Sequence, residues 1–302
     1  MTRRGWVLFA AMSLIWGIPY LFIKVAVDGG VPPAIVAWGR VAVAALVLLP
    51  VAWRVGALRD LRSWWLAAAA FAVVEIVGPF PLIATGEQRV SSSLAAILIA
   101  TVPLVMAILA LRFDADERVR GTRLIGLMVG LVGVAVLLGI DVVGSTDELL
   151  GSLMILLAAV GYAIGPLIVK RYLSDVHSLG PVTVALCVGT VVLAPLAGVS
   201  IPETTPSTVA IVSVVVLGIV CSAAAFVVFF ALIAEVGPGR STVITYLNPV
   251  VALALGVVLL AERPGPGSLA GLVLILLGSW LATRRPGAPV LEASPAEALM
   301  ER

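Results

Sequence analysis

The sequence has few charged residues. Asp, Glu, Lys and Arg together make up 12% of its 302 residues, whereas a soluble domain carries about a quarter. So few charges cannot form a water-soluble surface, which excludes a soluble globular protein. Hydrophobic residues account for 61% of the chain and the mean hydropathy is +1.17. Most of the surface is therefore expected to face lipid.

The chain also has few of the residues that enzymes and metal sites use. There is one histidine, His177, beside Asp175, and it has no second ligand nearby in the sequence. The two cysteines, Cys187 and Cys221, lie within apolar runs and have neither metal-ligand spacing nor a disulfide framework. No phosphate-binding loop and no Ser/His/Asp set is recognisable, and a net charge of +2 does not favour nucleic acid. We therefore expect no catalytic residue, metal, cofactor or nucleic-acid partner, and no ATP hydrolysis.

Long hydrophobic runs take up nearly the whole chain. Ten of them are near the length of about 20 residues with which a helix crosses a bilayer, and only helices satisfy their own backbone groups there. They cover about residues 6–27, 33–53, 63–83, 91–111, 121–140, 150–170, 180–199, 208–234, 239–260 and 267–283. The sequence thus predicts an all-α integral membrane protein with ten transmembrane helices. Residues 286–302 are expected to form a disordered cytoplasmic tail.

The distribution of Lys and Arg predicts the orientation. If the N-terminus lies inside and the segments alternate, fifteen of the 19 basic residues fall on the inside and only Arg89 and Arg263 fall on the outside. Lys24 and Arg40 fall within the apolar runs. Because basic residues concentrate in cytoplasmic loops, both termini are expected to be cytoplasmic in a multi-pass protein of the cell membrane.

The two halves of the chain resemble each other at an offset near 146. The matching features are Thr101-Val102-Pro103 with Leu247-Asn248-Pro249, Glu117 with Glu262, Gly126 and Gly133 with Gly271 and Gly278, and Lys24 with Lys170. We infer two five-helix repeats, residues 1–140 and 141–285. Five crossings are an odd number, so the second repeat has the opposite orientation. Inverted repeats of this kind build alternating-access carriers whose site lies near the midplane; a duplicated bundle without transport is the alternative.

These residues resemble the EamA-type family of the drug/metabolite transporter superfamily. The resemblance covers about residues 5–285, and its motifs recur in order in both halves. It rests on the first-helix run Trp16-Gly17-Ile18-Pro19-Tyr20-Leu21-Phe22-Ile23-Lys24, on Arg40, on Thr101-Val102-Pro103-Leu104 and Tyr246-Leu247-Asn248-Pro249-Val250, and on Glu117-Arg118 and Glu262-Arg263.

The resemblance implies a ten-helix inner-membrane carrier, often an exporter of amino acids, metabolites or drugs, without specifying the substrate. The chain departs from the family at Asn248, where a Glu often precedes the proline. It also has Tyr162-Ala163 where the first helix has Trp16-Gly17. A neutral amide at position 248 puts carboxylate-based coupling at that point in doubt.

Three ionisable residues fall within the predicted helices, where a charge costs about 2.5–3.5 kcal/mol on insertion scales and therefore suggests a function. Glu75, near the middle of the third helix, is either a proton-coupling or cation-binding carboxylate or a group satisfied by a neighbouring helix. Arg40 either binds a substrate carboxylate or pairs with Glu75 to lock the bundle. Lys24 either lines the cavity or extends to the lipid headgroups.

Aromatic and polar residues also lie on helices that the repeat brings to the centre. The cavity candidates are Trp16, Tyr20, Tyr162, Thr245, Tyr246 and Asn248. Tryptophans nearer the segment ends are expected to form interfacial belts; they are Trp6, Trp53, Trp64 and Trp65. Among prolines expected inside helices, Pro103 and Pro249 are the strongest hinge candidates. The GxxxG runs 126–130 and 267–271 predict close helix packing.

The sequence therefore favours a secondary transporter for a small metabolite, amino acid or drug. We expect an exporter in which one repeat rocks against the other. Transport is either coupled to proton exchange at Glu75 or proceeds by facilitated diffusion down the substrate gradient. A lipid-modifying enzyme would require paired carboxylates or histidines, which the sequence lacks, and a scaffold or sensor would be expected to carry a soluble domain. The partners expected are the substrate and the lipid bilayer, and an oligomer is not required because the second repeat supplies an internal partner.

Overall fold

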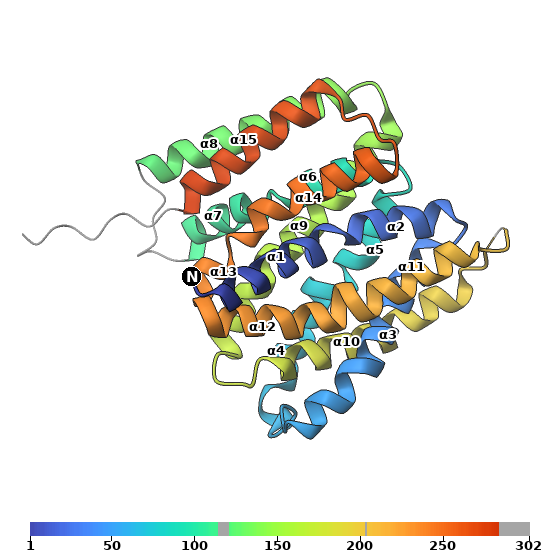
Figure 1. Ribbon diagram of the computed structural model, residues 1–302, viewed down its shortest axis with the longest axis vertical. Coiled ribbons are helices and arrows are strands. Elements are labelled where there is room, and N and C mark those ends of the chain that lie inside the picture. The colour runs from blue at the N-terminus through green and yellow to red at the C-terminus, as the bar shows by residue number, and fades with distance from the viewer. Residues whose placement is uncertain (114–120, 203, 284–302) are drawn as a thin grey trace, which may run out of the picture.

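The computed structural model describes residues 1–113, 121–202 and 204–283. The described residues form a bundle of helices and contain no strand (Figure 1). The elements of the first half are α1 (Arg3–Gly17), α2 (Pro19–Asp28), α3 (Pro33–Arg54), α4 (Leu61–Ala72), the π-helix η1 (Val73–Val77), α5 (Pro79–Gly86), α6 (Ser92–Ile99), α7 (Val102–Phe113), α8 (Thr122–Leu137) and the π-helix η2 (Leu138–Val142). Those of the second half are α9 (Thr146–Tyr172), α10 (Leu179–Val199), α11 (Thr208–Gly218), the π-helix η3 (Ile219–Ala224), α12 (Ala225–Val236), α13 (Pro238–Ser241), α14 (Ile244–Leu259) and α15 (Pro266–Thr283). The predicted tail and Glu117-Arg118 lie outside the described residues.

These elements combine into ten apolar spans. In the described part of the chain, nine are long and apolar enough to cross a membrane, and α14, extended by α13, is a shorter tenth. The fold class predicted from the sequence is thus confirmed. Lipid-facing side chains such as Leu46 and Val258, each 76% exposed, account for the high hydrophobic content.

Several prolines begin helices rather than interrupt them. Pro19 and Pro79 occupy the first turns of α2 and α5, and Pro103 lies in the first turn of α7 after a break at Ala100–Thr101. Proline is tolerated there because the first amides of a helix have no intrahelical acceptor. Pro249, by contrast, lies inside the continuous helix α14. The two hinge candidates therefore occupy different local structures.

The inverted repeat is visible in the contact between α8 and α15, which lie side by side along one edge of the bundle (Figure 1). A Cβ atom added at Gly126 would lie 2.8 Å from the carbonyl oxygen of Gly278, and one at Gly133 would lie 3.1 Å from that of Gly271. The offset maps Gly126 onto Gly271 and Gly133 onto Gly278, so each contact is the symmetry mate of the other. The predicted close packing is thus present, and it joins the two halves.

The π-helices η1 and η3 follow the same repeat. Each begins at the middle of a long span, at Val73 and at Ile219, which are 146 residues apart. A π-helix inserts an extra residue into the helical turn, and such segments are frequent at functional sites. Glu75 and Cys221 occupy equivalent positions in the two segments.

The two ends of the bundle are packed differently. Near Asp28, at the end far from the N-terminus, α2 packs against α5 and α6. The repeat maps these three elements onto the C-terminal half of α9, onto α12 and onto α13 with α14. In the described part of the chain, α9 makes no comparably extensive contact with α12, α13 or α14. The contact of α2 with α5 and α6 therefore has no equally extensive equivalent at the N-terminal end.

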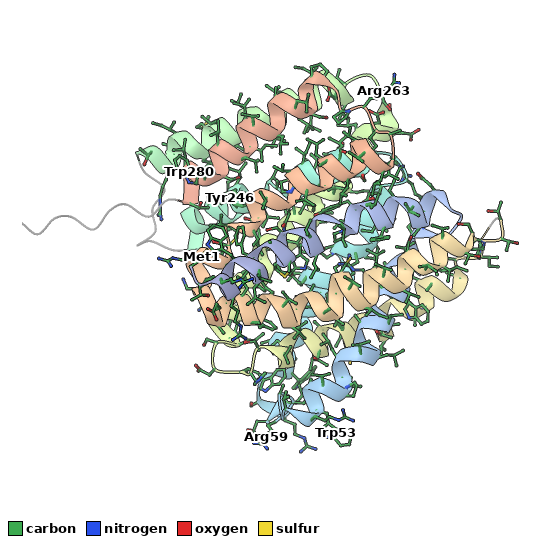
Figure 2. All side chains as sticks on the ribbon, in the orientation of Figure 1. Met1, Trp53, Arg59, Tyr246, Arg263 and Trp280 are labelled. Carbon is green, nitrogen blue, oxygen red and sulfur yellow. The ribbon has the colours of Figure 1, made fainter. Side chains whose placement is uncertain are left out.

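The tryptophans predicted to form belts fall into two classes. Trp6, Trp53 and Trp65 are 58%, 77% and 52% exposed, and Figure 2 shows Trp53 at the periphery of the bundle. The prediction for Trp64 is wrong, because this residue is buried and its indole donates a hydrogen bond to the carbonyl of Arg59. The loop after α3 folds back over α4, which the sequence pattern does not reveal.

Candidate functional site

Arg40 lies seven residues into α3 and binds the π-helix η3. Its Nε donates a hydrogen bond to Ser222 Oγ at 2.8 Å, and one Nη lies 3.5 Å from the carbonyl oxygen of Cys221. The guanidinium carbon is 4.1 Å from the centre of the Phe80 ring, a distance typical of a cation–π contact. A π-helix leaves carbonyls outside the regular ladder, and the arginine of the first half uses one from the second half.

The pairing of Arg40 with Glu75 is wrong. Among the described side chains, the ion pairs are Arg4 with Glu235 and Lys24 with Asp28. Arg40 is half-buried and forms its polar contacts with neutral oxygen atoms. It thus carries a positive charge within an apolar span without a carboxylate beside it in the described structure.

Glu75 lies in η1, in the same span as Phe80. It is half-buried, and its Oε2 is buried without a hydrogen-bond partner. The carboxylate lies against Gly165 of α9, where a Cβ atom would overlap Oε2. Neither alternative formulated from the sequence is established, but satisfaction of both oxygens by a neighbouring helix is absent from the described contacts.

Two tyrosines connect these charges. Tyr162 of α9 is near enough to interact electrostatically with both Arg40 and Glu75, and Tyr20 of α2 interacts with Tyr162 and with Arg40. Both side chains are half-buried and each packs against two hydrophobic clusters. The structure therefore brings Arg40, Glu75, Tyr20 and Tyr162 near one another.

Trp16 belongs to an aromatic cluster with three phenylalanines of α12. Its ring centre is 4.6 Å from that of Phe229 and 6.3 Å from that of Phe226, and Phe230 lies 6.1 Å from Phe229. All four side chains are half-buried. The three phenylalanines were missed from the sequence, although their spacing of three and four residues in the eighth span places them on one helix face.

Asn248 lies near this aromatic cluster, whereas Tyr246 does not. A Cβ atom at Gly17, next to Trp16, would lie 3.3 Å from the Asn248 carbonyl oxygen, and the Asn248 side-chain oxygen is buried without a hydrogen-bond partner. The Tyr246 hydroxyl hydrogen-bonds Thr283 Oγ1 at 2.7 Å, on α15 near the N-terminal end of the bundle (Figure 2). Its position gives no support to a cavity role.

A second polar cluster lies at the far end. Lys24 Nζ is 3.2 Å from Asp28 Oδ1 and donates a hydrogen bond to the carbonyl of Glu87 at 2.9 Å. The Lys24 side chain is 20% exposed and binds protein oxygens, so the prediction that it extends to the headgroups is wrong. Glu87 was missed from the sequence, because a glutamate beside a predicted loop is ordinarily solvated.

Two carboxylates cap helices at this end. Glu262 accepts hydrogen bonds from the amides of Ser92 and Ser93 at 2.7 and 3.0 Å, and also from the Ser93 hydroxyl. Asp141 accepts one from the Gly267 amide at 2.9 Å, at the start of α15. Each carboxylate meets the positive end of a helix dipole. Glu262 joins the second half to the first, and Asp141 joins the connection between the repeats to α15.

The described residues contain no group of three His, Cys, Asp or Glu side chains arranged to hold a metal ion. The arrangement at the centre can instead bind an organic ion, since it offers a guanidinium, a carboxyl, two phenols and an aromatic surface within a lipid-facing bundle. It contains no nucleophile paired with a base.

Comparison with known proteins gives a consistent result. The model of the EamA-like transporter family matches residues 3–139 and 149–284. The inner membrane transporter YedA of Escherichia coli (strain K12), whose function is uncharacterised, is 28% identical over 299 residues, covering 95% of each chain. A probable terminal-alkyne amino-acid exporter of Streptantibioticus cattleyicolor is 30% identical over 289 residues, covering 94% of this chain and 95% of the relative. A crystal structure that covers 94% of this chain and 97% of its own has a TM-score of 0.65 at 20% identity, which indicates a shared fold.

Proposed function

We propose, from the premise that the chain belongs to the EamA-like transporter family, that it is a secondary transporter that exports a small organic molecule bearing a carboxylate and an apolar group. The observation that carries this proposal is the position of Arg40, whose guanidinium lies within an apolar span without a carboxylate partner among the described residues. Metabolites, amino acids and drugs include such molecules.

The surroundings of Arg40 suit a substrate carboxylate. A guanidinium has five N–H donors in a planar fork, and its contacts with Ser222 and Cys221 use only some of them. Because a charge at this depth costs about 2.5–3.5 kcal/mol on insertion scales, its retention favours a ligand of opposite charge. The aromatic cluster around Trp16 would receive the apolar part of the substrate.

The two repeats support transport by alternating access. Their inverted arrangement is typical of carriers that open to one side at a time. At the far end α2 packs against α5 and α6, whereas α9 makes no comparably extensive contact with the equivalent elements at the N-terminal end. With the N-terminal end in the cytoplasm, as the basic residues favour, this conformation would be the one that receives substrate from inside the cell.

The proposed outward direction of transport is based on the name of one relative. One relative is named a probable exporter of an amino acid, and amino acids with apolar side chains are therefore the first probes to use. The proton gradient would drive export if Glu75, whose Oε2 is without a hydrogen-bond partner, binds a proton in each cycle. An uncoupled facilitator uses the same site without that proton, and a scaffold or sensor would move no substrate.

The test is uptake of radiolabelled apolar amino acids into proteoliposomes, with and without a pH gradient. A charge-assisted hydrogen bond contributes about 1.5–3 kcal/mol. Arg40→Ala is therefore expected to raise the substrate concentration at half-maximal uptake by about 10-fold to 100-fold. Arg40→Lys, which keeps the charge, should lose less. Arg59→Ala, at an exposed arginine of the N-terminal end, is the matched control and should leave affinity unchanged.

Glu75→Gln separates the coupled carrier from the facilitator. Coupling at Glu75 predicts that the variant loses accumulation driven by the pH gradient but keeps exchange of labelled for unlabelled substrate. Intact gradient-driven accumulation would refute coupling there. Unchanged affinity in Arg40→Ala would remove the binding role, and absence of flux across the whole panel would count against transport of this substrate class.

A further inference from the structure

Glu87 occupies the most enclosed position of the far-end cluster. The residue is completely buried, and neither of its carboxylate oxygens has a hydrogen-bond partner. It directly follows α5, at the position where the third span ends. Lys24 approaches it from α2 but donates to its backbone carbonyl and pairs with Asp28 rather than with its carboxylate.

An ionised carboxylate in this position would be strongly unfavourable. A buried charge without hydrogen bonds loses its hydration without compensation and ordinarily takes up a proton. The cation at Lys24 already compensates the charge of Asp28. The closed far end therefore favours the neutral form of Glu87.

Burial dominates the electrostatics of Glu87, and the charges around it act in both directions. Burial raises the pKa of Glu87 well above its usual value, the nearby carboxylates of Glu262 and Asp28 raise it further, and the cations of Lys24 and Arg40 oppose this. These groups come from α2, from α3 and from the segment after α14.

The remaining charged groups at this end contribute less. In its first turn α9, which packs on α5, carries Asp147, which is exposed, and Glu148, which is half-buried. Neither is among the charges that shift Glu87. The Arg89 guanidinium is bound to the carbonyl of Thr85. Lys24 is thus the nearest partner available to Glu87 once the far end opens.

A glutamate near the end of the eighth span shows what Glu87 lacks. Glu235 lies in the last turn of α12, and its carboxylate lies 2.5 Å from Thr2 Oγ1 and 3.9 Å from the Arg4 guanidinium. Its side chain is 20% exposed. The N-terminal end therefore compensates its glutamate with a hydroxyl and a cation, whereas the far end encloses Glu87 without a partner.

We propose that Glu87 is a proton-binding site that is filled when the far end closes and emptied when it opens. In the closed conformation the side chain is enclosed as the neutral acid. When the Glu262 carboxylate leaves the amides of Ser92 and Ser93 and the halves separate, water reaches Glu87, which releases its proton and pairs with Lys24. This site is separate from Glu75, and it deepens the proposed function by coupling the proton to opening of the far end.

The sign of the pH dependence follows from this difference in proton affinity. The closed conformation binds the proton more tightly, so low pH favours closure and rising pH favours opening. Between the pKa of Glu87 in the open form and that in the closed form, the ratio of closed to open molecules falls by up to about tenfold per pH unit.

The experiment measures the distance between spin labels across the far end as the pH is varied. Labels at Gln88 and Arg263, two exposed positions on opposite sides of the Glu262 cap, report separation of the halves, in a chain in which Cys187 and Cys221 are replaced by alanine. The parent protein in lipid nanodiscs is expected to shift from the short to the long distance as pH rises. Glu87→Gln, which imitates the neutral acid, should remain short throughout.

Three variants complete the test. Glu87→Asp retains a titratable group and should restore the pH response, and Glu75→Gln should keep it unchanged. Lys24→Met removes the partner of the ionised form of Glu87, so the pH midpoint of the distance change should move to higher pH. This variant provides a second test if Glu87→Gln folds poorly. A parent-like titration in Glu87→Gln, or an unchanged midpoint in Lys24→Met, would overturn the proposal.

The proposal rests on the proposed transporter function, and the two can fail separately. Substrate flux without a pH-dependent distance would overturn the role of Glu87 and leave transport standing. A pH-dependent distance that Glu87→Gln abolishes would support the proton site even where no apolar amino acid is moved.

Discussion

Gly126→Ala is expected to destabilise the bundle, because it forces apart the two helices that join its halves. The added Cβ would lie 2.5 Å from the amide nitrogen of Ala282 and from the Cβ of Leu281, and 2.8 Å from the carbonyl oxygen of Gly278. Ordinary contacts of a Cβ begin at about 3.4 Å. Two of these three atoms belong to the backbone, so a change of rotamer cannot relieve the overlap.

The size of the effect follows from the helix separation required. Moving α15 away by about 0.5–1 Å forfeits a quarter to a half of the dispersion energy of each contact along the interface. Overpacking of this kind costs about 1–3 kcal/mol. Gly278→Ala opposes Gly126 across the same contact and should cost a similar amount. The double variant should cost less than the sum, since one displacement relieves both overlaps.

The assay is the free energy of unfolding, measured by steric trapping in bicelles for both single variants and the double variant. Gly198→Ala in α10 is the matched control, because a Cβ atom there would have no neighbour within 4 Å. Alanine is a better helix former than glycine, so the control should be neutral or slightly stabilising. Gly126→Ala as stable as Gly198→Ala would refute the assignment of this contact.

Three further changes have defined outcomes. Gly165→Ala places a methyl group on the Glu75 carboxylate, so it should alter pH-gradient-driven uptake more than exchange in proteoliposomes; an equal effect on both would contradict this. Glu262→Gln weakens a helix cap worth about 0.5–2 kcal/mol and should lengthen the distance between the far-end labels at every pH. Asp141→Asn should lower the melting temperature but leave that distance unchanged. Identical behaviour of the two variants would argue against Glu262 as the closing contact. Trp64→Phe removes one hydrogen bond to a backbone carbonyl and should reduce the free energy of unfolding by about 1 kcal/mol, with exposed Trp65→Phe as the control that should show no change.

The sequence predicts the architecture well because that part of the fold is set by local, repeated properties. Span length follows from bilayer thickness, and the glycines at 126 and 133 are recognisable because their mates at 271 and 278 recur at the same spacing. The odd number of spans per repeat then requires the inverted arrangement.

The partners of the polar residues depend on tertiary contacts that no spacing reveals. Arg40 binds Ser222, which lies 182 residues away in a π-helix that the sequence pattern does not indicate. Tyr246 and Asn248 are two residues apart, yet the hydroxyl of one is directed to α15 while the other lies beside Gly17. A helix turns by about 100° per residue, so residues this close in sequence face different neighbours.

The fusion of two repeats has a consequence for the number of charged side chains that the bundle must hold within the membrane. The position equivalent to Arg40 is Leu186, and that equivalent to Glu75 is Cys221. An antiparallel pair of identical five-helix chains would have to carry each charge twice, once on either side of its axis. Divergence after duplication leaves one arginine and one glutamate at these positions, which halves the electrostatic penalty of inserting such charges into a membrane.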